Sequence, residues 1–324
     1  RARAGGLGAH APAPDDGRGP ASTSCSAGMG AVQCSDVLGC NEGGDNFEQA
    51  EEAEDPEQAL AVLFSAGHMA PIEQCHTFKC SEALEKEQLI KVRPTYTFED
   101  GTAYTGDWIG TMRHGVGLQV GTDGSRYEGQ WAMDVARGRG RMEYPDGDVY
   151  EGDWADNVRH GFGTYTHPDG TSYEGDWADG VCEGEGKETF LDGSRYIGRY
   201  AGGHPNGAGC MQLPDGSKYT GEFLEGEMHG KGAMSSIEGW TYDGQWSFGK
   251  MEGRGTYTYA DGRRYEGDFI DGLMEGVGSI DYLDKTRYEG EWRAGRRHGN
   301  GTFFAIGKKR TGVWRNGEHV GWSD

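Results

Sequence analysis

The chain has 324 residues, of which 59 are glycine and only 35% are hydrophobic, whereas aromatic residues reach 11%. Aromatic side chains must therefore supply the core that the scarce aliphatic ones do not. The formal net charge is −22, with −8 on residues 1–94 and −14 on the remainder. Both parts repel polyanions, which argues against nucleic acid and disfavours anionic membrane surfaces as partners. No apolar run approaches the roughly 18 residues that span a bilayer.

Residues 1–54 have no periodicity and are rich in Ala, Gly, Pro and Ser, with acidic residues toward the end. This composition predicts a disordered tail. Arg1 stands where Met would, and Arg3 and Arg18 follow it. The chain is therefore either processed, as after removal of an organelle-targeting segment, or starts inside a longer sequence.

Five cysteines precede residue 94, at spacings that match no common zinc site. They are Cys25, Cys34, Cys40, Cys75 and Cys80. Free thiols in a reducing compartment and disulfides in an oxidising one both stay open.

Residues 55–94 are predicted to form a short helical segment. Asp55-Pro56-Glu57 is typical of a helix start, with Asp as the N-cap and Pro at the first helical position. A second helix is predicted from about Ser81 to Val92, before Pro94. Two short helices have no core of their own, so we expect them to dock on the rest of the chain.

From residue 104 onward one pattern repeats every 23 residues, and such a period indicates a repeat architecture. The repeat opens on a tyrosine at positions 104, 127, 150, 173, 196, 219, 242, 265 and 288. A glycine follows two residues later in all nine copies, and an aromatic residue stands two further on. Every copy then carries Gly-x-Gly. The pattern resembles the MORN-repeat family over about residues 95–322.

Each copy divides into two strands, and the tyrosine, glycine and aromatic of the first strand share one face because side chains alternate. Asp-Gly pairs between copies predict tight primed turns, in which both central residues have positive φ. A second left-handed position is expected three residues after the aromatic. A lone second strand is predicted at residues 95–101, and a partial tenth copy ends near Gly321.

These features together predict an all-β fold class: an elongated single-layer antiparallel sheet of about nine 23-residue hairpin repeats over residues 95–324. At about 4.8 Å per strand it would be roughly 85–90 Å long. Bare backbone at the strand glycines predicts that aromatic rings from neighbouring strands lie over it. The opposite face carries cross-strand Glu and Arg or Lys side chains in contact with solvent.

No catalytic residue, cofactor site or metal site is predicted. Gly-x-Gly recurs at strand positions without the Gly-Lys-Ser/Thr and helix of a phosphate loop. Four histidines share one repeat position, which other copies fill with glutamate, and copies about 9.6 Å apart are too distant to share a metal ion. These histidines, at 114, 160, 229 and 298, are interpreted as polar groups of a turn or edge.

The resemblance implies a non-catalytic protein, because enzymes with such arrays carry their catalytic domains outside the repeats. Similar arrays occur in radial spoke head proteins of cilia, in junctophilins and in plant phosphatidylinositol-phosphate kinases. We therefore expect a structural scaffold that binds other proteins of a large assembly, in a cilium, a flagellum or another cytoskeletal structure of the cytoplasm. Two alternatives stay open: a phospholipid-binding membrane tether and an accessory subunit of an organellar complex. Basic residues scattered among acidic ones disfavour the lipid alternative.

The aromatic face is the predicted protein-binding surface, since a single-layer sheet has no second layer to cover it. Its predicted contact residues are Trp131, Tyr150, Trp154, Tyr173, Trp177 and Trp246. An amphipathic helix is the expected partner element.

Overall fold

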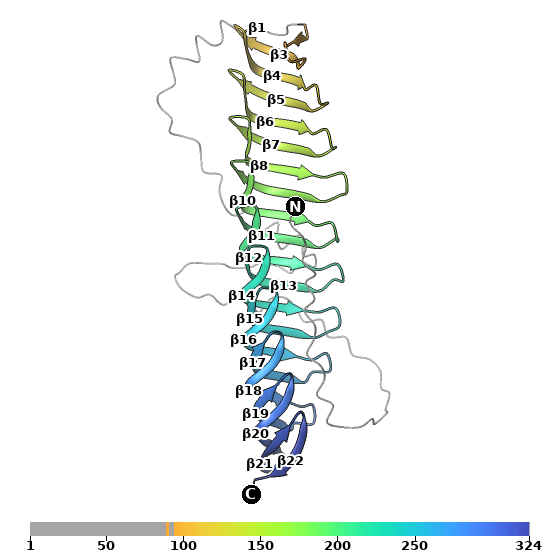
Figure 1. Cartoon of the computed structure of the whole chain (residues 1–324), viewed down its shortest axis with the longest axis vertical. Helices are drawn as coiled ribbons and strands as arrows, with labels where there is room; N and C mark the ends of the chain where they lie inside the picture. The colour runs from red at the N-terminus through yellow and green to blue at the C-terminus, as the bar shows by residue number, and fades with distance from the viewer. Residues whose placement is uncertain (1–88, 91–93, 324) are drawn as a thin grey trace, which may run out of the picture. The chain divides into compact units, whose positions relative to one another are not determined.

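The computed structural model describes residues 89–90 and 94–323, and these form one open, antiparallel, 22-stranded sheet with no helix among them (Figure 1). The predicted all-β fold class is therefore confirmed. The predicted tail, residues 1–54, and the predicted first helix lie outside the described residues. Within the described part, no helix is long and apolar enough to cross a membrane.

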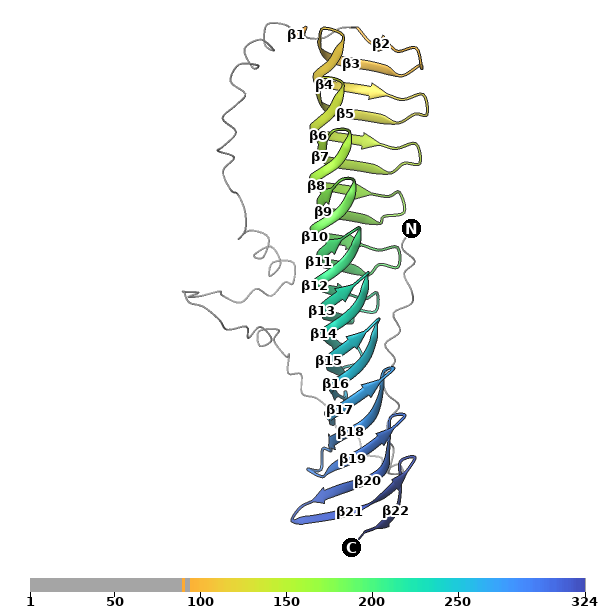
Figure 2. The same cartoon turned by 60° about the vertical axis from the view of Figure 1, so that its left-hand side comes forward.

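Each repeat is one β-hairpin, and each strand pairs with the next along the chain from β3 to β22 (Figure 2). The first strands are β3 (Ala103–Ile109), β5 (Arg126–Ala132), β7 (Val149–Ala155), β9 (Ser172–Ala178), β11 (Arg195–Ala201), β13 (Lys218–Leu224), β15 (Thr241–Ser247), β17 (Arg264–Ile270) and β19 (Arg287–Arg293). The second strands are β4 (Met112–Val120), β6 (Val135–Glu143), β8 (Val158–Thr166), β10 (Val181–Thr189), β12 (His204–Gln212), β14 (Glu227–Ser235), β16 (Lys250–Thr258), β18 (Leu273–Asp281) and β20 (Arg296–Ala305).

Both ends of the sheet depart from this pattern. β2 (Tyr96–Thr97) pairs with β3, which confirms the predicted lone strand. β21 (Lys308–Arg315) and β22 (Glu318–Trp322) form the predicted partial tenth copy. β1 (Leu89–Ile90) also pairs with β3, so the predicted second helix is wrong at these two residues. Pairing with the free edge of β3 overrides the local helical pattern there.

The turn inside each repeat is the primed one. β7 and β8 are joined by two residues, Asp156 at φ +50° and Asn157 at φ +66°. Positive φ at both positions defines a type I′ turn, whose twist matches that of the strands.

The Asp-Gly turns between repeats are different, and the prediction of primed turns there is wrong. Gly170 has φ +90°, but Asp169 is not left-handed. The Gly170 N–H donates to the His167 carbonyl at 3.0 Å, and the Asp169 carboxylate accepts from the Thr171 N–H at 2.9 Å. This is a type I turn followed by a left-handed glycine, in which aspartate acts through its side chain.

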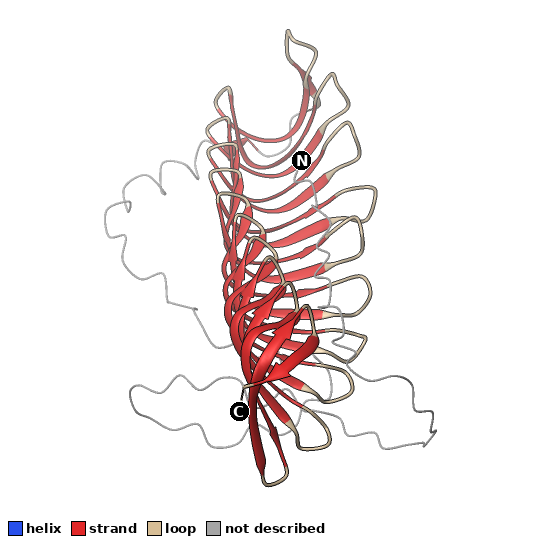
Figure 3. Ribbon diagram, turned by 60° about the horizontal axis from the view of Figure 1, so that its bottom comes forward, coloured by secondary structure: helices blue, strands red, loops and turns tan. Residues whose placement is uncertain are grey.

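A β-bulge interrupts the second strand of each repeat at Gly-x-Gly. In β7 and β8, Gly152 pairs with Gly163 while Asp153 pairs with His160, so Gly161 and Phe162 have no partner on β7. Gly161 adopts φ +60°, which favours glycine. Bulges bend strands, and Figure 3 shows the strands bent in the same sense along the sheet. We call the side inside this bend, where the aromatic residues lie, the inner face.

Candidate functional site

A continuous row of aromatic rings runs along the inner face. Each repeat tyrosine contacts the aromatic residue of its own repeat and that of the next, from Trp108 to Trp314, with ring centroids 4.9–5.6 Å apart and planes at 72–89°. We call this row the aromatic ladder. Edge-to-face pairs of this kind contribute about 0.5–1.5 kcal/mol each beyond their buried area. The ladder therefore couples every repeat to its neighbours.

Paired glycines make room for the tyrosine rings, as the sequence predicts. A Cβ on Gly163 would lie 2.4 Å from the Tyr150 hydroxyl oxygen, and one on Gly152 would lie 2.5 Å from the Gly163 Cα. The Tyr150 hydroxyl donates to the Asp153 carbonyl at 2.9 Å. The indole N–H of five ladder tryptophans donates to the preceding repeat, as from Trp177 to the Gly163 carbonyl at 3.0 Å.

The six predicted contact residues all belong to this ladder and are all buried. Their exposed fractions lie between 0% for Tyr150 and 8% for Trp154. The expectation that a single-layer sheet leaves these rings accessible is therefore wrong. Each ladder ring packs against rings of its own and of a neighbouring repeat, so the ladder residues cover one another. The six residues build this face, and a partner would meet other side chains on it.

A second set of inner-face residues is only partly buried. They lie seventeen residues after the repeat tyrosine, and where this residue is a large apolar one it packs against the ladder. The apolar members, which we call the inner strip, are Tyr144, Phe190, Leu213, Tyr259 and Tyr282. Sequence reasoning missed them, although an apolar residue recurs at this position in five of the nine copies. They are regularly spaced, partly exposed apolar groups on the face that was predicted to bind protein.

The inner face is polar in its first half and apolar in its second. Asp148 accepts hydrogen bonds from the Tyr165 hydroxyl at 2.7 Å and from His167 Nδ1 at 2.9 Å, and the Arg159 guanidinium lies 4.9 Å from the Tyr165 ring centroid. Glu188 accepts from the Tyr200 hydroxyl at 2.7 Å. Further along, methionines fill the corresponding positions and are buried, at 211, 228, 234, 251 and 274.

Burial shifts the titration of two groups in the polar half. Desolvation raises the pKa of the Glu188 carboxyl, and the hydrogen bond from Tyr200 opposes this only in part. Desolvation also raises the pKa of the Cys182 thiol to about 12. A thiol with so high a pKa stays protonated at neutral pH and is a poor nucleophile. Among residues 89–90 and 94–323, no group of three His, Cys, Asp or Glu side chains is arranged to hold a metal ion.

The repeat pattern decides the family. The MORN repeat matches nine consecutive segments, residues 104–126, 127–149, 150–172, 173–195, 196–218, 219–241, 242–263, 265–287 and 288–309, which together cover more than half of the chain. The chain belongs to the MORN-repeat family. MORN repeats are a non-catalytic, repeat-based interaction or scaffold module. No curated protein matches the chain in sequence.

Solved structures share only a distant likeness with this MORN array. The TCP10 domain of CPAP from Danio rerio, in complex with a STIL peptide, matches at 14% identity and a TM-score of 0.31, covering 71% of this chain and 98% of that chain. The TCP10c domain of Sas-4 from Drosophila melanogaster matches at 13% identity and a TM-score of 0.28, covering 53% and 96%. At these TM-scores the likeness supports no argument about function.

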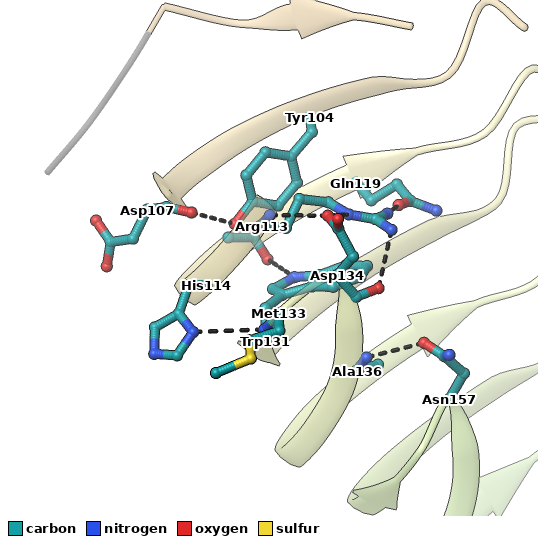
Figure 4. Close-up of polar contacts among 11 residues, drawn as sticks. Tyr104, Asp107, Arg113, His114, Gln119, Trp131, Met133, Asp134, Ala136 and Asn157 are labelled. Carbon is teal, nitrogen blue, oxygen red and sulfur yellow. Dashed lines mark hydrogen bonds and ion pairs between the residues drawn. The ribbon is translucent and has the colours of Figure 1, made fainter. Parts of the chain in front are cut away.

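Neighbouring MORN repeats are also tied together at the hairpin edge (Figure 4). The Arg113 guanidinium lies 4.2 Å from the Trp131 ring centroid and donates to the Asp134 carboxylate at 3.0 Å, and Arg113 also bonds to Gln119. His114 Nδ1 accepts from the Met133 N–H at 3.4 Å.

Other copies use this histidine position in the same way, which agrees with its interpretation as a polar group of the edge. Glu275 accepts from the Ala294 N–H at 2.7 Å, and His298 Nδ1 accepts from the Asn316 N–H at 3.4 Å. The position therefore links the backbone of successive repeats.

The predicted ion pairs are frequent up to about residue 284 and sparse beyond it, where Arg287 pairs with Asp281 and Glu289. Ten of the fifteen basic residues in 95–284 pair with a carboxylate, as Arg254 does with Asp268 and Lys250 with Asp271. Residues 285–315 hold nine basic and two acidic side chains. The expectation that basic residues are always interleaved with acidic ones is therefore wrong at the C-terminal end of the sheet.

Proposed function

We propose that this chain is a non-catalytic scaffold that holds partner proteins along the inner face of its MORN array. The observation that carries the proposal is the inner strip, a row of partly exposed apolar side chains. The strip packs against the aromatic ladder, whose rings are buried and contact one another from repeat to repeat. Successive members lie one or two repeats apart, about 10–20 Å at 4.8 Å per strand. An extended apolar row on a rigid element favours an extended partner.

An amphipathic helix is the partner element that fits such a row most economically, because its apolar stripe runs along one side. The polar half of the inner face, with Asp148, His167 and Glu188, gives the row a direction. A partner helix would accordingly carry polar groups at one end of its apolar stripe. We further propose a large cytoskeletal assembly, with a cilium or flagellum as its site. The repeat family supports this proposal by resemblance alone.

Binding by the inner strip is tested by affinity purification of the full chain from cells that express a tagged copy. Phe190→Ser and Leu213→Ser remove partly exposed apolar groups, and we expect the double variant to lose at least about tenfold of partner retention, in the range of interface hot spots. Glu174→Ala changes an exposed residue on the outer face and is the control. Circular dichroism melts first establish that both variants are folded.

The outcome decides between the two faces. Retention that falls with Glu174→Ala but not with the strip variants would place binding on the outer face and contradict the proposal. Imaging of the tagged chain tests the location separately: absence from cilia and from cytoskeletal structures would leave the interaction proposal standing but remove the ciliary one.

A further inference from the structure

The C-terminal end of the sheet carries an isolated positive charge. Residues 95–284 contain 15 basic and 34 acidic side chains, whereas residues 285–315 contain nine basic and two acidic ones. The net charge of the sheet therefore changes from negative to positive near residue 285. The sheet is acidic along most of its length and basic at one end. A charged partner can therefore distinguish its two ends.

The positive charge gathers at one edge, on the last two inter-repeat turns. Earlier turns place Asp-Gly or Glu-Gly there, but the last two have Asp284-Lys285 and Gly307-Lys308. Lys309 and Arg310 follow at the start of β21. We call Lys285, Lys308, Lys309 and Arg310 the basic end; it lies at the blue C-terminal end of the sheet in Figure 1.

These four side chains are exposed, and within the described part of the chain none of them forms an ion pair. Lys309 and Arg310 lie against the rings of Phe304 and Trp322, which hold the cations in place without neutralising them. This contrasts with residues 95–284, where two thirds of the basic residues are paired. The basic end is therefore arranged to meet an anion from outside the sheet.

Lys285 also departs from the other inter-repeat turns in its backbone. Its backbone has φ +64°, at the turn position that other copies fill with glycine, such as Gly262 at φ +94°. A side chain in the left-handed region is strained, which glycine avoids. This turn therefore carries an exposed cation where the earlier inter-repeat turns carry glycine.

The sequence contains one segment of matching chemistry. Residues 45–57 carry seven carboxylates and no basic residue. This segment lies outside the described residues, and its charge density is a property of the sequence alone. No stretch of the array of equal length carries as many carboxylates. The segment is therefore complementary in charge to the basic end.

A second copy supplies this segment more readily than the same chain does. Between Glu57 and the first residue of β1, which is paired with β3, stand 31 residues. A random coil of that length spans about 30 Å on average. The basic end lies about 85 Å from β3, at 4.8 Å per strand. Reaching it within one chain would require a nearly extended tether, whose entropy cost is high.

We propose that the basic end binds the acidic segment 45–57 of another copy, so that the chains associate head to tail through complementary charge. This goes beyond the scaffold function, which concerns the inner face and would survive its failure. Association of this type is heterologous: each copy offers one acidic and one basic partner, and copies add in a single direction.

The test is sedimentation velocity of the full chain in about 0.05 M salt and in about 1 M salt, where the Debye length falls to about 3 Å. We expect association at low salt that is lost at high salt. Lys308→Glu with Lys309→Glu should weaken it at least about tenfold, and so should Glu51→Lys with Glu52→Lys, because exposed charge pairs govern encounter and orientation. Combining the four changes should restore association.

The matched control is Lys187→Glu with Lys231→Glu, which alters the net charge equally at exposed outer-face sites. A monomer at low salt, an equal loss in the control, or no recovery in the combined variant would each overturn the proposal. Binding of the unchanged chain to phosphatidylserine vesicles, lost in Lys308→Glu with Lys309→Glu and without self-association, would assign the basic end to lipid and also overturn it.

Discussion

At the scale of single residues, glycine has two separate roles in this sheet. The second glycine of Gly-x-Gly, such as Gly163, lies under a tyrosine ring and has no space for a Cβ. The first, such as Gly161, has no ring over it but adopts the positive φ of the bulge, beside the Asp153 carboxylate. Sequence periodicity identifies both glycines but does not separate these roles, since both recur in every copy.

We expect Gly163→Ala to lower the free energy of unfolding by about 2–3 kcal/mol, because it displaces the Tyr150 ring, as overpacking does. Gly170→Ala, at a turn with open space but φ +90°, should cost about 1 kcal/mol through backbone strain alone. Thermal or urea unfolding of the two variants measures the difference. If Gly170→Ala costs more, the ring-over-glycine packing does not control stability.

Glu188 is a partly buried carboxyl at a repeat position that later copies fill with buried methionine, at 211 and 234. Burial raises the pKa of its carboxyl, so the charged form is disfavoured in the folded chain and folding is weakened above the unfolded pKa. Glu188→Gln keeps an acceptor for the Tyr200 hydroxyl without the charge and should stabilise the fold by about 1 kcal/mol at pH 7.

Comparison of Glu188→Gln with the wild type at two pH values separates an effect of charge from an effect of packing. At a pH below about 4, where both states of the wild-type carboxyl are protonated, the gain should disappear. Urea denaturation of both proteins at the two pH values tests this. A gain that persists unchanged at low pH would show that the substitution acts through packing.

At the scale of the hairpin, the sequence period predicts the strands, the face on which each side chain lies and the repeat boundaries. It does not predict the type of turn. Asp-Gly is compatible with a primed turn and with a type I turn that ends on glycine, and the local sequence is the same in both. The turns between repeats adopt the type I geometry that ends on glycine. Likewise Leu89–Ile90 joins the free edge of β3 against its local helical pattern, because an unpaired strand edge is a stronger influence than propensity.

The bulge is supported by a side chain of the facing strand. Asp153 accepts from the Phe162 N–H at 3.1 Å, and Gln130 does the same for the Arg139 N–H at 3.0 Å. Asp153→Ala should lower stability by about 0.5–1 kcal/mol, since water replaces the lost acceptor only in part. Asp153→Asn retains an acceptor and should be nearly silent. Equal losses in chemical denaturation would show that the bulge does not depend on this bond.

The face proposed to bind a partner was likewise only partly predictable from the sequence. The aromatic pattern correctly predicts where the rings lie, but their exposure depends on the bend that the bulges introduce. A flat sheet would leave Trp177 accessible, whereas in the bent sheet its exposed fraction is 6%. The burial of the ladder rings depends on contacts between neighbouring repeats, which the pattern of a single repeat does not specify.

At the scale of the whole array, the ladder should make tyrosine ionisation cooperative. Burial raises the pKa of the first eight repeat tyrosines, to about 12 at Tyr104 and Tyr150. Because the folded pKa exceeds the unfolded value of about 10, their contribution to stability is complete below pH 10 and is lost as pH rises toward 12. We expect tyrosinate absorbance to appear in one steep step that coincides with loss of the β-sheet circular dichroism signal.

The denatured chain in urea is the control for this titration, and its tyrosines should ionise gradually near pH 10. Gradual ionisation of the native chain near pH 10, with the sheet signal intact, would show that the rings are accessible to solvent and that the ladder does not couple the repeats.

The central claim is that successive repeats form one periodic sheet, in which each adds two strands, about 9.6 Å. The most direct test is a pulsed electron-spin distance measurement between labels at positions 174 and 266, which are exposed, equivalent and four repeats apart, in a full chain whose native cysteines are replaced. We expect a narrow distribution near about 38 Å, and near about 29 Å after deletion of residues 196–218, one whole repeat. A broad distribution, or a distance that the deletion leaves unchanged, would contradict the account.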